Sequence, residues 1–315
     1  MKNEFIVLIG SSVIAALILP FLINILYRLN IRDRGNIRKK DGKLDNKVFV
    51  EILGGKAGTP KGGGIIWLIL FPVISFFLFG TVPLNLILIA ITLVYGLIGL
   101  LDDSKKISGF KLDHLVRKVK FVVEVGIGVL FSHLLITNLN LSNSLFNYAF
   151  ITFLFTSYTN AFNINDGLDG LLTGQTIWMF TGMLILTMLQ HQNTVAMYYA
   201  IMIGILIVFL YFNINPARIF MGDVGSMSLG VIALALAVAS NNLLPFIIMT
   251  VPSILTIISS LIQMLSIKFL GKKVFKIAPL HHHFQALGWN ETKVTERYWL
   301  AQIFFVFLAL AVSTL

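Results

Sequence analysis

The sequence predicts an all-α, polytopic integral membrane protein of about ten transmembrane helices, organised as one domain over residues 1–315. Composition is the first reason: the chain is 57% hydrophobic and 12% charged, with a mean hydropathy of +0.87, which excludes a soluble domain. The second is a series of apolar runs that approach the roughly 20 residues needed to cross a bilayer. The third is the confinement of basic residues to the connections on one side.

The predicted spans follow one another along the whole chain. They cover residues 5–27, 63–80, 84–101, 119–136, 147–164, 170–189, 195–212, 225–241, 243–267 and 297–315. The first run is too long for a signal peptide and has only Lys2 before it, so we expect it to remain as a helix. The fifth has a polar second half, at Thr156, Ser157, Thr159 and Asn160, so we expect it to face protein or water.

Basic residues predict the orientation. All but one of the 24 Lys and Arg residues lie at 28–61, at 105–120, at Arg218 or at 268–297, and each stretch follows an odd-numbered span. The positive-inside rule makes these connections cytoplasmic and puts both termini on the extracytoplasmic side. The net charge of +10 therefore belongs to loops and does not indicate nucleic acid. The predicted active-site loops are 28–62, 102–118, 165–170, 213–224 and 268–296. The chain has no cysteine, which excludes disulfides and thiolate chemistry.

Acidic residues stand at the ends of apolar runs. Asp166 and Asp169 close the segment T-N-A-F-N-I-N-D-G-L-D-G. An ionised carboxylate is costly inside hydrocarbon, so we expect both to lie at a water-filled rim or to bind a cation. Capping of the sixth span is the alternative, and it accounts for one of the two.

Asp102 and Asp103 end the third predicted span. Adjacent helix residues point about 100° apart, so one acid can face a site while the other meets solvent or a lysine. Lys120 opens the next span, and Glu124 follows one turn later, where it can pair with Lys120. The alternatives are an interfacial stop signal for the acids and a snorkelling side chain for Lys120.

A further acid, Asp223, lies between small residues in F-M-G-D-V-G-S. Mg²⁺ is typically held by one or two carboxylates with phosphates and waters, so Asp223 is the predicted Mg²⁺ ligand. Arg218 nearby favours an anion. A plain turn before the eighth span is the alternative.

Two loops carry residues suited to phosphate. Six glycines fall in the eleven residues 54–64, where they let the backbone approach a ligand and where Lys56 and Lys61 supply charge. A flexible lead into the second span is the alternative. His281, His282 and His283 are predicted to lie in a loop and do not share a helix face, which argues against a zinc site. They fit phosphate donors or one general acid or base.

Together, from about Lys56 to Trp299, these motifs resemble the polyprenyl-phosphate N-acetylhexosamine-1-phosphate transferases. N-A-F-N-I-N-D-G-L-D-G-L is similar to the family's N-A-V-N-L-T-D-G-L-D-G-L, and F-M-G-D-V-G-S to F-M-G-D-T-G-S. P-L-H-H-H-F-Q-A-L-G-W favours the branch that uses UDP-N-acetylmuramoyl-pentapeptide. G-T-P-K-G-G-G departs from the G-T-P-T-M-G-G of that branch and, with the short loop after Asp103, resembles the sister enzymes that use UDP-N-acetylglucosamine or a related hexosamine.

The resemblance implies an enzyme of the cytoplasmic membrane, with its active site on the cytoplasmic face. It would transfer phospho-N-acetylmuramoyl-pentapeptide from its UDP conjugate to undecaprenyl phosphate, giving lipid I and UMP in peptidoglycan synthesis. It implies Mg²⁺ at Asp223 and catalytic roles for Asp102, Asp103, Asp223, His282 and Lys120. It implies substrate contacts for Lys56, Asn163, Asp166, Asp169, Asn213, Phe220, Gln263, His281 and His283. Membrane lipid is an expected partner and nucleic acid is not, while a homodimer stays open.

Both reactants of such a transfer are anionic, so we expect positioning and charge neutralisation by Mg²⁺ and by cations such as Lys120 and His282 to dominate catalysis. Asp102 is expected to orient the polyprenyl phosphate or to accept its proton. A two-step path with an Asp nucleophile is the mechanistic alternative. Two functional alternatives remain: a sister hexosamine transferase, and a cation-coupled transporter, which would place its acids near the membrane midplane.

Overall fold

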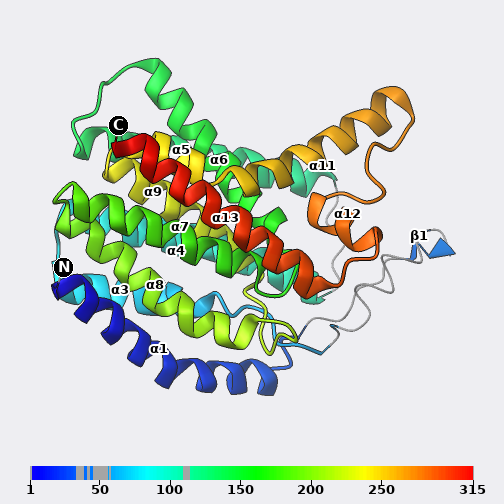
Figure 1. Ribbon diagram of the computed structural model, residues 1–315, viewed down its shortest axis with the longest axis horizontal. Helices are drawn as coiled ribbons and strands as arrows, with labels where there is room; N and C mark the ends of the chain where they lie inside the picture. Colours follow the sequence, from blue (N-terminus) through cyan, green and yellow to red (C-terminus); the bar gives the residue numbers. More distant parts are fainter. Residues whose placement is uncertain are drawn as a thin grey trace.

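The computed structural model describes residues 2–32, 39–40, 43–44, 56, 58–108 and 114–314, and this part of the chain is almost entirely helical (Figure 1). One antiparallel pair of two-residue strands lies in a stretch that the sequence predicts to be a loop. The all-α prediction is otherwise confirmed. The elements are α1 (Lys2–Arg28), β1 (Lys39–Lys40), β2 (Lys43–Leu44), α3 (Ile65–Phe79), α4 (Pro83–Ser108), α5 (His114–Asn138), α6 (Leu145–Asn165), α7 (Leu171–Leu189), α8 (Asn193–Asn213), α9 (Gly222–Ala239), α10 (Leu243–Met249), α11 (Val251–Leu270), α12 (Leu280–Ala286) and α13 (Glu291–Thr314).

Eight of the described helices are long and apolar enough to cross a membrane, so the chain is a multi-pass membrane protein. They are α1, α4, α5, α7, α8, α9, α11 and α13. The other two predicted spans are helical but fall short of this criterion. α3 has only 15 residues, and α6 has 21 residues but too polar a composition. As expected for its polar half, α6 packs against protein, and Thr159 there is buried.

The ninth predicted span, 243–267, is broken in two at Thr250. Pro252 has no N–H to give to a carbonyl one turn earlier, so an unbroken helix would lose a hydrogen bond here. The Thr250 hydroxyl lies 2.7 Å from the Tyr158 hydroxyl, and this contact holds the break against α6. Beyond the break, α11 extends away from the other helices (Figure 1).

The central helix is α9, whose residues are almost all buried. α4 and α6 pack along it. At Gly99 of α4, an added Cβ would lie 2.3 Å from the Asp223 carbonyl oxygen, so only glycine lets the two backbones come this close. This approach brings the end of α4, with Asp102 and Asp103, against the beginning of α9.

The glycines before α3 serve packing within the chain. The N–H groups of Gly63 and Gly64 donate to the carbonyls of Phe220 and Met221 at 2.8 and 2.9 Å. A Cβ on Gly64 would lie 2.1 Å from the Cα of Gly225. These contacts lay residues 60–64 along the entry to α9. They are an intramolecular reason for glycine where the sequence suggests approach to a ligand; Gly54 and Gly55 lie outside the described residues.

Both chain ends lie at one end of the helix bundle, and α12 lies at the other (Figure 1). This arrangement agrees with two termini on one side of the membrane. Which side is cytoplasmic stays a prediction. Parts of the predicted loops 28–62 and 102–118, namely 33–38, 41–42, 45–55, 57 and 109–113, lie outside the described residues.

Candidate active site

Lys61 joins the acid pair formed by Asp103 and Asp223. Its Nζ lies 2.9 Å from Asp103 Oδ1 and 3.9 Å from Asp223 Oδ1, and the three side chains are at most 18% exposed. The other Asp103 oxygen accepts a hydrogen bond from the Val224 N–H at 3.1 Å. Because water is largely displaced, the charges in this acid pair interact more strongly than charges on an open surface.

Gly222 of the G-D-V-G-S segment makes room for the acid pair. Its φ of +74° lies in the left-handed region that favours glycine, and an added Cβ would lie 2.5 Å from Asp103 Oδ2. The glycine before Asp223 is therefore required both by the backbone and by the carboxylate from α4.

Asp102 faces a different lysine. It forms an ion pair with Lys120 of α5, which also lies 3.5 Å from Glu124, as the spacing predicts. Asn160 of α6 donates to the other Glu124 oxygen at 3.3 Å. Asp102 and Asp103 are both buried, and each pairs with a lysine: Asp102 with Lys120, and Asp103 with Lys61. This burial argues against an interfacial stop signal for either acid.

A second buried ion cluster joins Lys56, Asp169 and Glu291. Lys56 Nζ lies 2.7 Å from Asp169 Oδ1 and also pairs with Glu291 Oε1 at the start of α13. The same Glu291 oxygen accepts a hydrogen bond from the Asp169 N–H at 2.6 Å. Asp169 Oδ2 accepts from the Asn215 side chain at 3.0 Å and from the Ala217 N–H at 3.1 Å. Three remote segments therefore meet at Asp169.

Opposing effects set the charge of Lys56. Burial alone would lower the pKa of its ammonium, but the adjacent carboxylates of Glu291 and Asp169 more than offset this and raise it. Lys56 is therefore a firm cation at neutral pH. Its Nζ lies 5.9 Å from the centre of the Phe220 ring, which places Phe220 beside this cluster.

Asp166 lies just after α6 and interacts with both ion clusters. Burial raises the pKa of its carboxyl to about 7, Lys61 and Lys56 oppose the rise, and the negative charges of Asp223 and Asp103 add to it.

The capping alternative for Asp166 and Asp169 is wrong. α7 begins after Gly170, which has a φ of +71°, and no side chain caps the helix. Neither acid is therefore used to cap the N-terminus of α7.

The three histidines lie on a short helix, α12, which corrects the expected loop. His281 is fully buried against Gly167, where a Cβ would lie 2.3 Å from its Nε2. His282 Nδ1 lies 2.7 Å from Gln285 Oε1. His283 points elsewhere: its Nδ1 accepts from the Lys276 N–H at 3.2 Å. The three side chains thus point in different directions, as expected for consecutive helix residues, which lie about 100° apart around the axis.

Burial keeps the first two histidines neutral. It lowers the pKa of His282, with a further contribution from Lys56, although the hydrogen bond with Gln285 works in the other direction. It lowers the pKa of His281 well below its usual 6.5, and His282 adds to the effect. His282 is therefore a neutral imidazole at neutral pH, and not the cation that the sequence suggests.

Three predicted substrate contacts are engaged with the protein itself. Asn163 donates to Ser226 Oγ at 3.1 Å, which keeps it beside the acid pair. Asn213 accepts from Thr173 at 2.7 Å and donates to the Ile219 carbonyl at 2.8 Å. Gln263 accepts from the N–H groups of residues 274 and 275 and donates to the carbonyl of residue 275. Asn213 and Gln263 therefore brace loops of the site, and their substrate roles stay predictions.

The acid pair fits a magnesium ion. Among the described residues, no three Asp, Glu or His side chains are grouped to hold a metal by themselves. Two carboxylates that share a lysine are instead a partial ligand set, which suits an ion that completes its shell with phosphate and water. The carboxylate oxygens of Asp103 and Asp223 are therefore compatible with Mg²⁺ bound together with a phosphorylated substrate.

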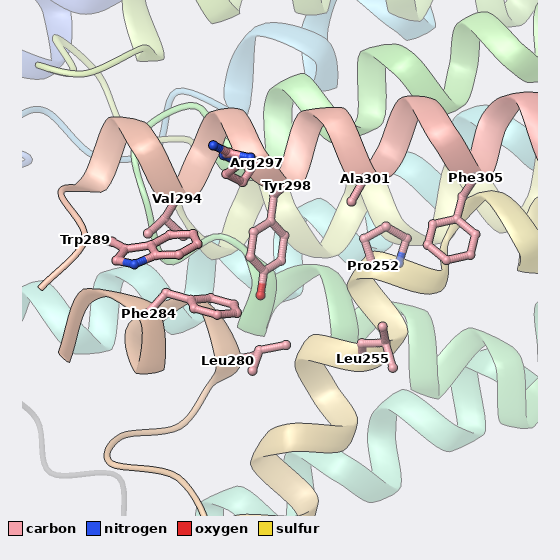
Figure 2. Close-up of a pocket in the computed structure, with 10 residues that line it drawn as sticks. All are labelled: Pro252, Leu255, Leu280, Phe284, Trp289, Val294, Arg297, Tyr298, Ala301 and Phe305. Carbon is pink, nitrogen blue, oxygen red and sulfur yellow. The ribbon is translucent and has the colours of Figure 1, made fainter. Parts of the chain in front are cut away.

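An apolar pocket of about 260 Å³ opens beside the histidines, between α11, α12 and α13 (Figure 2). Phe284 and Trp289 close one end, and Pro252 and Phe305 lie at the other. Tyr298 connects the pocket to the site, because its ring lies 6.5 Å from that of His281. The pocket can take an apolar chain whose polar end lies near α12.

Sequence reasoning misses Glu291 and underestimates Lys61. Glu291 is the first acidic residue after Asp223, and it follows a stretch whose charged residues are all basic, which is a signal that it pairs with a cation elsewhere. Lys61 is visible as a basic residue among glycines. Its partners are not visible, because they are contributed by α4 and α9.

The chain is similar in sequence to known proteins. The family model described as glycosyl transferase family 4 matches residues 85–241. Phospho-N-acetylmuramoyl-pentapeptide-transferases from Staphylococcus aureus (strain bovine RF122 / ET3-1) and Staphylococcus saprophyticus are each 32% identical to the chain over 314 residues, covering 94% of both sequences. The phospho-N-acetylmuramoyl-pentapeptide-transferase from Staphylococcus carnosus is 31% identical, and the alignment covers 94% of this chain and 95% of that protein.

Proposed function

The chain belongs to glycosyl transferase family 4, and from that premise we propose that it transfers phospho-N-acetylmuramoyl-pentapeptide from its UDP conjugate to undecaprenyl phosphate. As a family member it is a membrane transferase that moves a sugar 1-phosphate onto a polyprenyl phosphate. The products would be lipid I and UMP, for peptidoglycan synthesis. The proposal for the donor is supported by its similarity to phospho-N-acetylmuramoyl-pentapeptide-transferases that match almost the whole chain.

One observation carries the catalytic assignment. Acids and lysines that are far apart in the sequence meet in two largely buried ion clusters, around Lys61 and around Lys56. A transporter would need its acids along a path near the midplane. A cluster gathered at helix ends, with two lysines facing four carboxylates, suits a reaction between two phosphorylated reactants instead.

The reaction joins the acceptor to the sugar-bearing phosphate of the donor. An oxygen of undecaprenyl phosphate attacks the phosphorus that carries the sugar, and the bond from that phosphorus to the oxygen of UMP breaks. Mg²⁺ at Asp223, with Asp103 beside it, would supply charge neutralisation of the donor diphosphate. The chain's own part is to hold both anions together, and we assign this to Lys56 and Lys120, which are partly buried cations.

Asp102 and His282 are proposed to manage the acceptor phosphate. Asp102 is held by Lys120, so its carboxylate can orient a phosphate hydroxyl or accept its proton. His282 is neutral, and its bond with Gln285 holds the proton on Nδ1, which leaves Nε2 as an acceptor. The apolar pocket beside α12 supplies a place for the first units of the polyprenyl tail. The site would open at the cytoplasmic face, where nucleotide sugars are found.

The test is Mg²⁺-dependent release of UMP by the purified protein in detergent. UDP-N-acetylmuramoyl-pentapeptide and UDP-N-acetylglucosamine are each supplied with undecaprenyl phosphate, and the lipid product is identified by mass spectrometry. Transfer from the pentapeptide conjugate supports the proposal. Transfer from UDP-N-acetylglucosamine alone would refute this donor while leaving the family activity intact.

A second donor is favoured by two features of the sequence. Lys61 interrupts the G-T-P-T-M-G-G pattern, and the loop after Asp103 is short, as in the sister enzymes that use UDP-N-acetylglucosamine or a related hexosamine. The same donor comparison decides between the two candidates.

A further inference from the structure

Lys61 lies where the proposed metal ligands meet. Within the described part of the chain, it is the cation that bridges Asp103 and Asp223, at 2.9 and 3.9 Å. Two carboxylates from different helices therefore face one ammonium. The proposed transfer assigns Lys61 no contact of its own with either reactant.

The backbone fixes Lys61 in this place. Its N–H donates to the Ile31 carbonyl at 3.1 Å, and the Phe220 N–H donates to the Pro60 carbonyl at 2.8 Å. The chain next to Lys61 therefore pairs with the segment that leads into Asp223. These backbone hydrogen bonds hold residue 61 beside the acid pair, so its side chain reaches Asp103 and Asp223.

A cation at this distance opposes a second cation. A charge within about 4–6 Å shifts an ionic equilibrium by roughly one to three powers of ten when the site is shielded from water. Lys61 neutralises one of the charges that would attract a divalent ion, and it lies against Asp103 Oδ1, an oxygen that such an ion would use. Without substrate, the negative charge of the acid pair is thus already partly neutralised.

We propose that Lys61 is the resident counter-ion of the Asp103–Asp223 pair and competes with the divalent cation for these carboxylates. The donor diphosphate relieves the competition, because its negative charge supplies a new partner for Lys61 and further oxygens for the ion. Metal binding is then weak in the free enzyme and becomes tight with the donor. This inference rests on the proposed function, since it takes Asp223 as the metal ligand.

The experiment is direct Mn²⁺ binding, followed by electron paramagnetic resonance on the full-length protein in detergent without substrate. Lys61→Met removes the charge and keeps much of the side-chain length, while Lys61→Arg keeps the charge. We expect Lys61→Met to bind Mn²⁺ at least about tenfold more tightly than wild type. Lys61→Arg should bind it as weakly as wild type. Lys273→Met, at an exposed position, is the matched control and should change nothing.

UDP provides a second readout. It should tighten Mn²⁺ binding by a larger factor in wild type than in Lys61→Met, because only wild type has a competing ammonium to release. Lys61→Gln replaces Lys61→Met if the latter does not give a monodisperse, folded protein. Unchanged or weaker Mn²⁺ binding in the neutral variants, or an equal effect of UDP in both proteins, would overturn the inference.

Asp223→Asn separates this inference from the proposed function. If it leaves Mn²⁺ binding unchanged, the proposed metal site itself is wrong. If it removes binding while the neutral Lys61 variants fail to strengthen it, the metal site stands and the counter-ion inference alone is overturned.

Discussion

Glu291→Gln tests whether the cluster around Lys56 serves the donor. The substitution keeps an oxygen that can accept from the Asp169 N–H and removes the charge that faces Lys56. Lys56 keeps its ion pair with Asp169 at 2.7 Å, so the substitution removes one of the two carboxylates that hold its ammonium and leaves the other. Hydrogen bonds that involve a charged group contribute about 1.5–3 kcal/mol. We therefore expect a loss of about 2 kcal/mol in the positioning of Lys56.

This loss should appear in substrate binding. About 2 kcal/mol corresponds to a roughly 30-fold fall in kcat/KM. If Lys56 holds the donor equally in the ground state and in the transition state, the fall lies in the KM for the UDP-sugar and kcat is little changed. The assay is UMP release at several donor concentrations with a fixed excess of undecaprenyl phosphate.

Two controls make the result decisive. Glu296→Gln changes an exposed acid on the same helix and should leave both constants unchanged. The double variant with Lys56→Met should be about as impaired as Lys56→Met alone, because the two residues act as a unit. If Glu291→Gln behaves like Glu296→Gln, or if the double variant shows additive losses, Glu291 does not position Lys56.

Three further predictions concern packing, pH and charge. Gly64→Ala should destabilise the protein by about 3 kcal/mol in a thermal unfolding assay, because the new methyl meets the Gly225 backbone, whereas Gly126→Ala, with open space around it, should not. Burial lowers the pKa of His281, so the unfolded chain binds a proton there more readily: the contribution of this residue to stability is full above its usual 6.5 and is lost as the pH falls below that value. His281→Gln should therefore flatten the decline in melting temperature between about pH 7 and pH 5. Lys120→Met should lower kcat by about 10²- to 10³-fold in the UMP assay, since it removes the cation paired with Asp102, and a fall of less than tenfold would argue against a catalytic charge.

Much of the site is predictable because its charged residues lie at the ends of predicted membrane spans. An acid at the end of an apolar run, such as Asp103 or Asp223, needs a partner, and the sequence offers few. The pairing of Lys120 with Glu124 follows from helical spacing alone. The order of the helices is equally legible, because bilayer thickness sets their length.

Tertiary pairing is the part that spacing does not reveal. Lys56 and Glu291 are 235 residues apart, and no local pattern links them. The neutral state of His282 depends on burial by other segments. The short helix α12 has too few residues for a periodic signal, and the break before Pro252 is hidden inside a run that is apolar on both sides.

The central claim is that Asp223 stands at the centre of a phosphoryl-transfer site, and its most direct test is the reaction of Asp223→Asn. Wild-type protein should release UMP only when Mg²⁺, UDP-N-acetylmuramoyl-pentapeptide and undecaprenyl phosphate are all present. The variant should release no UMP above background, although a thermal unfolding assay shows that it is folded. UMP release by the variant at the wild-type rate would contradict the account.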